Sequence, residues 1–446
     1  MKVIKQKTIK FTTDNGLCTS CGICKNICPK ECISWEFKKG MYFPKIDEKT
    51  CVECSMCMKV CPGAEHSYES QQNSMLEKVV GTYQKTYNAW SKNETVRHMS
   101  ASGGVVTTLI VKLLQSKAYD KAFCLDTYAY NEQLKTVPKT TDDFRKEWVD
   151  NKTFKSRYLP VSHEQTVKYI KSNRDERVII VGTSCAIQGI RNVIQQLKLK
   201  QENYLLIGLF CDKVFNYNVY AYFEDGEWSQ GKKVSKVHFK NKESGGWPGN
   251  MKLFFEDGSN CYLDKDERGK VKEYFMPERC LYCVDKLNST ADISVGDNYT
   301  KQDSSVFGSN SVIIRTQIGQ NAWEKCSDLL ETKIVGIEQI AKWQYLEGRM
   351  NNLYFARLKE NQIKKQHGVE VCLNKGLVCE ENIDVYERSW KRNLEILHAG
   401  EIYDYNPKEL QKQFKKTEEL KNPRDIRNIL ERGYYFIKRK MVRGDN

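Results

Sequence analysis

The chain has 446 residues, 40% of them apolar, with a formal net charge of +14 and 18 cysteines. This length exceeds one ordinary hydrophobic core, so we expect two or three domains. The sequence has no apolar run long enough to span a bilayer, and its N-terminus lacks the apolar segment of a secretory signal, which predicts a cytoplasmic protein without a membrane span. The positive charge suits an acidic partner. Without Lys/Arg blocks interleaved with aromatics, and without a zinc-finger pattern, we expect no nucleic-acid binding.

Half of the cysteines lie near the N-terminus, and eight of these nine stand in two runs, CTSCGICKNICP and CVECSMCMKVCP. Both follow the C-x2-C-x2-C-x3-C-P spacing of two-cluster ferredoxins, in which the fourth cysteine of each run binds the other cluster. We therefore expect one [4Fe–4S] cluster on Cys18, Cys21, Cys24 and Cys61, and a second on Cys28, Cys51, Cys54 and Cys57. Zinc sites usually use separated pairs, and disulfides do not suit the cytoplasm.

Cys32 falls outside the two runs, so we expect it to be a bystander. The link from Lys30 to Thr50 indicates a hairpin packed against the clusters. Residues 1–70 are thus predicted to form an electron-carrying domain with no substrate pocket of its own. The polar stretch 71–95 is typical of a linker.

Two short motifs suit a phosphate-bearing cofactor. In HMSASGGVVTTLIVKLL, the small residues Ser102 to Gly104 precede an amphipathic helix, whose backbone N–H groups suit a phosphate. An ordinary N-cap with flexible glycines is the alternative. In FKSRYLP, Lys155 and Arg157 stand beside Tyr158, which suits a phosphate and a ring but is also a common surface pattern.

The stretch RVIIVGTSCAIQG predicts the start of a strand–turn–helix–strand unit. Residues 178–181 are a continuous apolar run, typical of a buried parallel strand, and residues 204–210 are the next one. Cys185 follows the first strand and Cys211 ends the second. Since parallel strands end at the same edge of a sheet, we expect both cysteines at one rim, where open α/β sheets bind ligands.

Two further cysteines, Cys280 and Cys283, form a CxxC in MPERCLYC. With Cys185 and Cys211 they are open to four interpretations: buried core thiols, a nucleophile at Cys185, a zinc site or a [4Fe–4S] cluster. The ferredoxin-type module favours the cluster, because a chain of clusters needs a terminus beside an acceptor. From about residue 340 the chain is polar and helical, and we find no chemistry there.

In chain order, SGGVVT, KSRY, VGTSC, GLFC, RCLYC and DISVGD resemble the coenzyme F-420 hydrogenase/dehydrogenase β-subunit family, over roughly residues 70–340. The resemblance implies an α/β fold that binds FAD and passes electrons between clusters, flavin and an acceptor such as coenzyme F-420. It implies that the four later cysteines hold a third [4Fe–4S] cluster. One departure is Ser184, where the family usually has proline.

The resemblance also assigns candidate roles to single residues. Asp297 is the candidate catalytic residue, in contact with the flavin or a substrate proton. The implied FAD contacts are Ser102, Gly103, Gly104, Lys155, Ser156, Arg157, Tyr158, Thr183 and Gly296.

We therefore predict an α/β chain, α+β overall, in which a small ferredoxin domain (1–70) precedes the N-terminal (71–170) and C-terminal (171–340) regions of an FAD-binding domain. A basic, mostly helical extension follows (341–446). The predicted function is an iron–sulfur flavoprotein oxidoreductase that passes electrons through FAD to an unidentified small-molecule acceptor. Ferredoxin or a partner subunit is the expected redox partner. The alternative is an electron-relay subunit active only within a larger complex.

Overall fold

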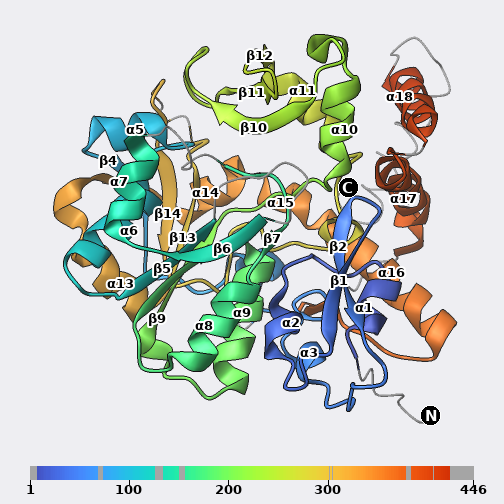
Figure 1. Cartoon of the computed structure of the whole chain (residues 1–446), viewed down its shortest axis with the longest axis horizontal. Coiled ribbons are helices and arrows are strands. Elements are labelled where there is room, and N and C mark those ends of the chain that lie inside the picture. The colour runs from blue at the N-terminus through green and yellow to red at the C-terminus, as the bar shows by residue number, and fades with distance from the viewer. Residues whose placement is uncertain are drawn as a thin grey trace, which may run out of the picture.

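The computed structural model describes residues 8–68, 74–125, 134–149, 156–300, 302–303, 305–377, 383–404 and 406–421. Within these residues, nine strands form one mixed sheet at the centre of the molecule (Figure 1). In spatial order they are β15 (Leu330–Ile334), β4 (Lys85–Ser91), β14 (Asn310–Ile314), β13 (Ile293–Asp297), β9 (Tyr204–Leu209), β8 (Val178–Gly182), β5 (Lys121–Leu125), β6 (Leu134–Lys139) and β7 (Val161–Ser162). The predicted mixed α/β class is therefore confirmed.

Four neighbouring strands of this sheet, β13, β9, β8 and β5, run parallel. Both of their faces are buried: Ile179 and Ile207 join one core cluster, whereas Ile180 and Leu206 join another. This explains why the strands are continuous apolar runs rather than alternating ones. The predicted strand–helix–strand unit is present as β8, helix α9 (Ser184–Gln196) and β9.

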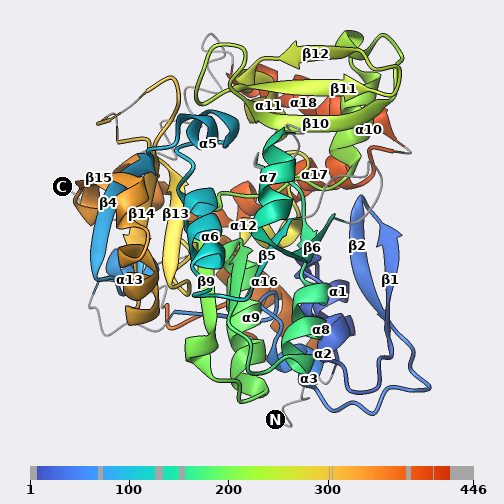
Figure 2. The ribbon, with the colours of Figure 1, turned by 60° about the vertical axis from the view of Figure 1, so that its left-hand side comes forward.

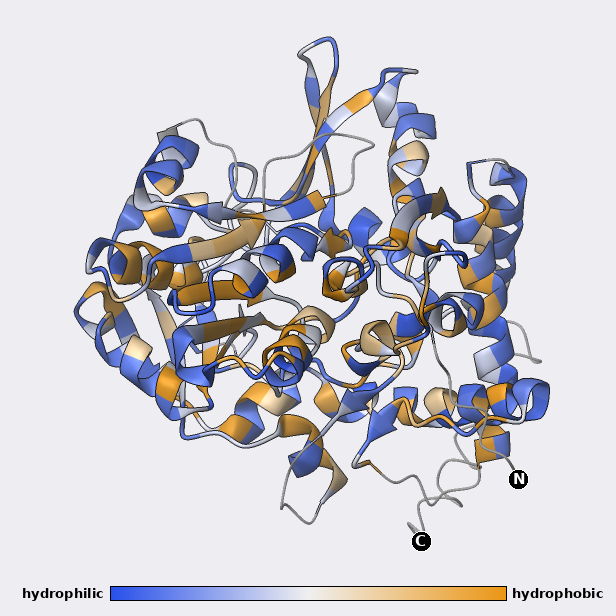
Figure 3. Ribbon diagram, turned by 60° about the horizontal axis from the view of Figure 1, so that its bottom comes forward, coloured by the Kyte–Doolittle hydropathy of each residue, from blue (hydrophilic) through white to orange (hydrophobic). Residues whose placement is uncertain are grey.

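Helices cover both faces of the sheet (Figure 2). One cluster contains side chains of α6 (Val105–Gln115), α7 (Thr141–Val149) and α13 (Gln317–Glu324); the other contains side chains of α8 (Glu164–Ser172) and α9. Short helices α4 (Met75–Val80) and α5 (Glu94–Met99) flank β4. Figure 3 shows hydrophobic residues gathered on the central strands and on the helix sides that face them.

The N-terminal module is small and packs directly on the α/β core. It contains α1 (Lys10–Asp14), α2 (Ile23–Ile27), β1 (Ile33–Lys38), β2 (Met41–Ile46), α3 (Met56–Lys59) and β3 (His66–Ser67). The predicted hairpin is confirmed, since β1 and β2 pair antiparallel. Ile23 and Ile27 of α2 belong to the same buried cluster as Ile187 and Ile190 of α9, so the module and the sheet share one core (Figures 1 and 2).

The expectation of a linker over residues 71–95 is wrong. Residues 85–91 form β4, which pairs antiparallel with both β14 and β15. The strand is polar in sequence, which resembles a linker, but two of its polar side chains are buried and hydrogen-bonded. Asn88 donates to Thr300, and Thr86 donates to the Val335 carbonyl.

A separate antiparallel sheet stands at one end of the molecule, at the top of Figure 1. Strands β11 (Asn250–Phe255) and β12 (Asn260–Leu263) form a hairpin around the turn EDGSN, and β10 (Val234–Asn241) extends it. Helix α10 (Asn218–Asp225) precedes this sheet in the chain, and α11 (Lys265–Val271) and α12 (Glu278–Leu281) follow it.

The described part beyond residue 336 is mostly helical, as predicted. Its elements are α14 (Ile337–Trp343), α15 (Leu346–Arg349), α16 (Asn351–His367), β16 (Asn374–Lys375), α17 (Glu387–Glu401) and α18 (Pro407–Lys421). Strand β16 pairs in parallel with β3, which ties this region to the N-terminal module. None of the helices in the described residues is both long and apolar enough to cross a membrane.

The contact between module and sheet generates a first prediction. Gly189 lies on α9, where an added Cβ would overlap Ile23 Cδ1 and approach Pro62 Cδ to 3.2 Å. We expect Gly189→Val to destabilise the protein by about 1–3 kcal/mol, because extra volume in a packed interface forces side chains apart. The measurement is the midpoint of urea unfolding.

The control is Gly269→Val in α11, where an added Cβ meets no atom within 4 Å. It should change stability by less than about 0.5 kcal/mol. An equal effect of both substitutions would show that the module does not pack on α9 as described.

Candidate functional site

The first cysteine group comes together as the spacing predicts. Its members line one small cavity under the loop before α2, and they are Cys18, Cys21, Cys24 and Cys61. The loop wraps tightly around them because Ser20 and Gly22 adopt left-handed backbone angles. Burial, and then repulsion by Cys61 and Cys185, raises the pKa of Cys21 to about 12.

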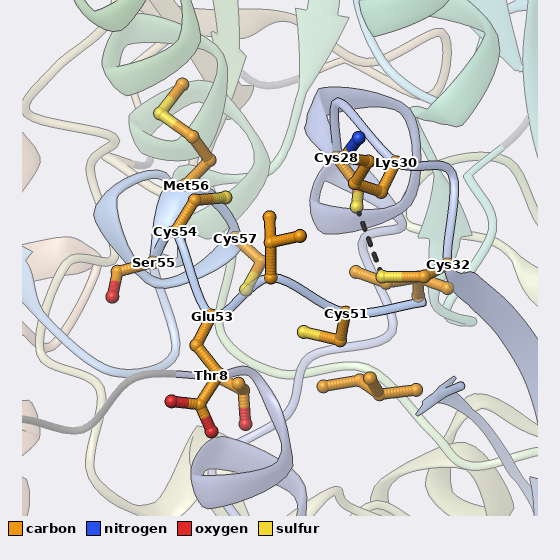
Figure 4. A pocket seen from close by; sticks show the side chains of 13 residues that line it. Thr8, Cys28, Lys30, Cys32, Cys51, Glu53, Cys54, Ser55, Met56 and Cys57 are labelled. Carbon is orange, nitrogen blue, oxygen red and sulfur yellow. Dashed lines mark hydrogen bonds between the residues drawn. The ribbon is translucent and has the colours of Figure 1, made fainter. Parts of the chain in front are cut away.

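The second cysteine group lines a neighbouring cavity (Figure 4). The predicted members Cys28, Cys51, Cys54 and Cys57 all border it, and Cys54 is exposed. Cys32, expected to be a bystander, lies in the same cavity with its Sγ 3.4 Å from that of Cys28. Sequence spacing missed this, because the turn after Pro29 folds Cys32 back beside Cys28.

The third cysteine set comes from three places in the chain. Cys185 lies in the first turn of α9, Cys211 follows β9, and Cys280 and Cys283 flank the end of α12. Burial raises the pKa of Cys211 well above its ordinary value, and repulsion by Cys280, Cys185 and Cys283 adds to this. Cys185, Cys211 and Cys280 line one cavity, so the predicted approach of Cys185 and Cys211 at one rim of the sheet is present.

Two buried arginines lie beside these thiols. Arg279 donates to the carbonyls of Gly63 (2.9 Å) and Leu373 (3.1 Å). Burial raises the pKa of Cys61 and of Cys185, and the charge of Arg279 offsets part of this rise. The pKa of Arg349 is raised: burial lowers it, but Cys283, Asp212, Cys280 and Cys211 outweigh burial.

Each arginine keeps one buried N–H group without a partner in the described part of the chain, Nη1 in Arg279 and Nε in Arg349. Such orphaned donors beside clustered thiolates suit an anionic inorganic group. Asn352 fixes the CxxC loop by donating to the carbonyls of Cys283 (2.8 Å) and Cys280 (3.4 Å). Neither Arg349 nor Asn352 was expected, since the region beyond residue 340 carries no motif.

The thiols adjoin a cavity of about 360 Å³ at the rim where β5, β8, β9 and β13 end. Its lining includes one cysteine of the first group and three of the third set, namely Cys21, Cys185, Cys211 and Cys280. It also includes most of the implied flavin contacts: Ser102, Gly104, Ser156, Arg157, Tyr158, Thr183 and Gly296, together with Asp297. Lys155 lies outside the described residues.

The Ser102–Gly104 turn is held against the sheet. Ser102 Oγ donates to the Ser309 carbonyl at 2.6 Å, and an added Cβ on Gly103 would come within 2.9 Å of the Ala89 carbonyl. Gly104, with φ +81°, is the N-cap of α6 and has no side chain to cap the helix, and Asn310 Oδ1 accepts a hydrogen bond from the Val105 N–H at 3.4 Å. The first-turn residues Val105 to Thr107 line the cavity, so the helix N-terminus opens into it.

Asp297 lies in the cavity as one half of a buried ion pair with Lys240, which sequence analysis missed. Tyr299 Oη and Trp247 Nε1 also donate to its carboxylate, at 3.1 Å and 3.4 Å. Burial alone would raise the pKa of Asp297, but Lys240 and these donors outweigh it and hold the pKa below its ordinary value. Asp297 is thus a carboxylate that fixes a cation at the cavity wall.

His163 also lines the cavity and is buried. Burial lowers its pKa to about 4, so the ring is neutral at pH 7, and its Nδ1 has no partner among the described residues. Its backbone N–H donates to the Cys21 carbonyl at 2.8 Å, which joins the cavity wall to the first cysteine group. In sequence it is a lone histidine, so nothing marked it.

In the described residues, no group of three or more His, Cys, Asp or Glu side chains is arranged to hold a single metal ion.

Residues 17–64 match the family model described as a 4Fe-4S dicluster domain, which supports two clusters in the module. Residues 86–163 and 175–340 match the models for the N-terminal and C-terminal parts of the coenzyme F420 hydrogenase/dehydrogenase beta subunit, together more than half of the chain. The chain therefore belongs to the coenzyme F420 hydrogenase/dehydrogenase beta subunit family, a family of oxidoreductase subunits, with a dicluster domain in front. The predicted family resemblance is confirmed.

Two individual proteins illustrate this similarity. An uncharacterized protein of Nostoc sp. is 22% identical over 247 residues, 52% of this chain and 54% of that protein, so the match spans about half of the relative. A chain in a solved structure of the F420-reducing [NiFe] hydrogenase complex from Methanosarcina barkeri is 21% identical. That similarity covers 66% of this chain and 98% of the other, with a TM-score of 0.49.

The ion pair in the cavity generates a second prediction. Asp297→Asn should destabilise the protein by about 3–5 kcal/mol at pH 7, because it leaves the Lys240 ammonium buried without its counterion. Adding Lys240→Met should recover most of the loss. Because the folded pKa of Asp297 is lowered, its contribution is present at neutral pH and is lost as the pH falls through that pKa.

The midpoint of urea unfolding measures both effects. The control is Asp257→Asn, which removes the partner of Lys232 in an exposed ion pair and should change stability far less. If the single and double variants are equally unstable, Asp297 acts on something other than Lys240.

Proposed function

We propose that the chain is an iron–sulfur flavoprotein oxidoreductase that passes electrons from its N-terminal module through FAD to a small-molecule acceptor. The observation that carries the proposal is the shared cavity. Candidate flavin contacts and cysteines from two groups line the same space, with Cys21 from the module and Cys185 from the sheet. Electrons delivered to the module therefore have a short route to the cavity.

The cysteine groups fit iron–sulfur clusters. Close, buried thiols repel one another when ionised, and cationic iron relieves that repulsion while binding the thiolate forms. The proposed ligand sets are Cys18, Cys21, Cys24 and Cys61 for the first cluster, Cys28, Cys51, Cys54 and Cys57 for the second, and Cys185, Cys211, Cys280 and Cys283 for the third. The Arg279 charge lies near both Cys61 and Cys185, where it offsets the negative charge of the first and third sets together.

The cavity fits FAD. Its volume lies within the range of about 300–1000 Å³ that is common for ligand sites, and the open N-terminus of α6 with Arg157 suits a diphosphate. When bound, the clusters supply one-electron transfer and FAD supplies two-electron chemistry. Lys240 and Asp297 place a polar ion pair, with no net charge, at the cavity wall. We propose coenzyme F-420 or another small molecule as acceptor and a cytoplasmic location.

A relay subunit that works only within a larger complex is the second candidate, and the match to beta-subunit models favours it. The two are separated by assaying the purified chain with reduced ferredoxin and F-420. Turnover by the chain alone supports the enzyme. Inactivity until a partner subunit is added supports the relay.

Analysis of the anaerobically purified protein tests the proposal. We expect one FAD and about twelve irons with matching sulfide, from three four-iron clusters. About eight irons with one zinc would contradict the third cluster and keep the dicluster module. Absence of flavin would contradict the assignment of the cavity.

Cys185→Ser provides the matched test of the third set. It should lower the iron content by about four atoms and stop electron transfer to the flavin, while the module clusters stay. Cys261→Ser, at a comparably half-buried thiol on β12, should keep the full iron content. A Cys185→Ser protein with full iron and activity would remove Cys185 from the ligand set.

A further inference from the structure

A second, larger hollow lies apart from the cavity. It is a polar groove of about 1620 Å³ between the α3 turn, one side of α9 and residues 369–375. Among the described residues, none lines both the groove and the cavity. Its volume exceeds the range of about 300–1000 Å³ for small-molecule sites, which favours a macromolecular occupant.

The groove reaches both cysteine groups of the module. Cys54 and Cys61 line it, and Cys54 is exposed there. If the two groups hold the proposed clusters, an occupant of the groove touches one ligand of each. Electron transfer needs this kind of close approach, and the groove offers it without entry into the flavin cavity.

The groove is also electropositive. Of the described residues that line it, six are basic and two are acidic. Both acidic residues are already paired, Glu65 with Lys375 at 3.3 Å and Glu370 with Lys364 at 2.7 Å. Two further basic residues are paired as well, Arg191 with Asp292 and Arg357 with Glu360. Lys59 and Lys78 are unpaired within the described part of the chain. Lys59 lies on the Cys54 side of the groove, and Lys78 lies on the α4 side. Unpaired cations at a rim attract and orient an anionic partner.

We propose that this groove docks a small acidic electron-carrier protein, which reduces the module through the cluster held at Cys28, Cys51, Cys54 and Cys57. The inference rests on the proposed function and names its donor site. With a cluster bound, Cys28, Cys51, Cys54 and Cys57 would hold the group that takes one electron from the reduced carrier; no bond would form or break and no proton would move. The oxidised carrier then leaves.

Charge reversal at the groove tests the docking site. The holoprotein is mixed in a stopped-flow instrument with a reduced acidic [4Fe–4S] ferredoxin, and bleaching of the module clusters is followed. Lys59→Glu and Lys78→Glu should each lower the second-order rate at low ionic strength, and the double variant should lower it at least about tenfold, because electrostatic steering contributes factors of about 10–1000. Salt should slow the wild type more than the variants.

Two controls separate docking from damage to the clusters. Reduced methyl viologen, a small cationic donor, should reduce every variant at least as fast as the wild type. Lys265→Glu, an exposed lysine on α11 at the other end of the molecule, should leave the ferredoxin rate unchanged. Lys78 lies outside the cysteine module, so its variant tests the groove without touching the ligand loops.

Unchanged ferredoxin rates in the double variant would overturn the docking site. Equal slowing with ferredoxin and methyl viologen would overturn it too, since that pattern indicates a damaged cluster. The readout is the module itself, so a protein that lacks FAD or the third cluster still gives a clear result. Failure of the proposed function is therefore distinguishable from failure of the docking site.

Discussion

The arrangement of the whole protein depends on one packing contact, between α2 of the module and α9 of the sheet. Ile23 and Ile27 are buried in the same cluster as Ile187 and Ile190, and Gly189 lets the two helices approach. Cys24 lies on α2 and Cys21 lies just before it, whereas Cys185 lies on α9. The apolar core therefore fixes the spacing of the redox-capable groups, in place of a flexible linker between two independent domains.

The second constraint is electrostatic. Many thiols are buried close together, and in ionised form they would repel strongly, so positive charge has to be supplied nearby. Arg279 and Arg349 provide it from inside the protein, one between the module and the third set and one beside the CxxC loop. Both are nearly inaccessible to water, and their side chains are held by backbone carbonyls or by Asp212.

Much of this architecture could be predicted from local patterns. The two cysteine runs predicted two groups in which the last cysteine of each run joins the other run, and both cavities have this composition. The apolar runs of β8 and β9 placed Cys185 and Cys211 at one rim of the sheet. These features succeed because spacing or strand direction alone determines them. The expected linker failed because β4 is a strand whose polar side chains are buried by partners more than 200 residues away in the chain.

The residues that sequence reasoning missed share one property. Lys240, His163 and Arg349 carry no motif, and each reaches its site through contacts between distant segments. A lone lysine on a strand of a separate sheet gives no sign that it will pair with Asp297. The position of Cys32 beside Cys28 was also not predicted, because it depends on the turn after Pro29 and not on the spacing of the cysteine run.

The pairing of β3 with β16 has a consequence for the order in which the protein is made. The N-terminal module is synthesised first, but its last strand and the Arg279 side chain both need partners at residues 373–375. Until that segment leaves the ribosome, the cysteine loops lack one of their walls. Completion of the module thus waits for residues 373–375, and a chain truncated before residue 373 has every cysteine proposed to bind iron but not the scaffold that closes around them.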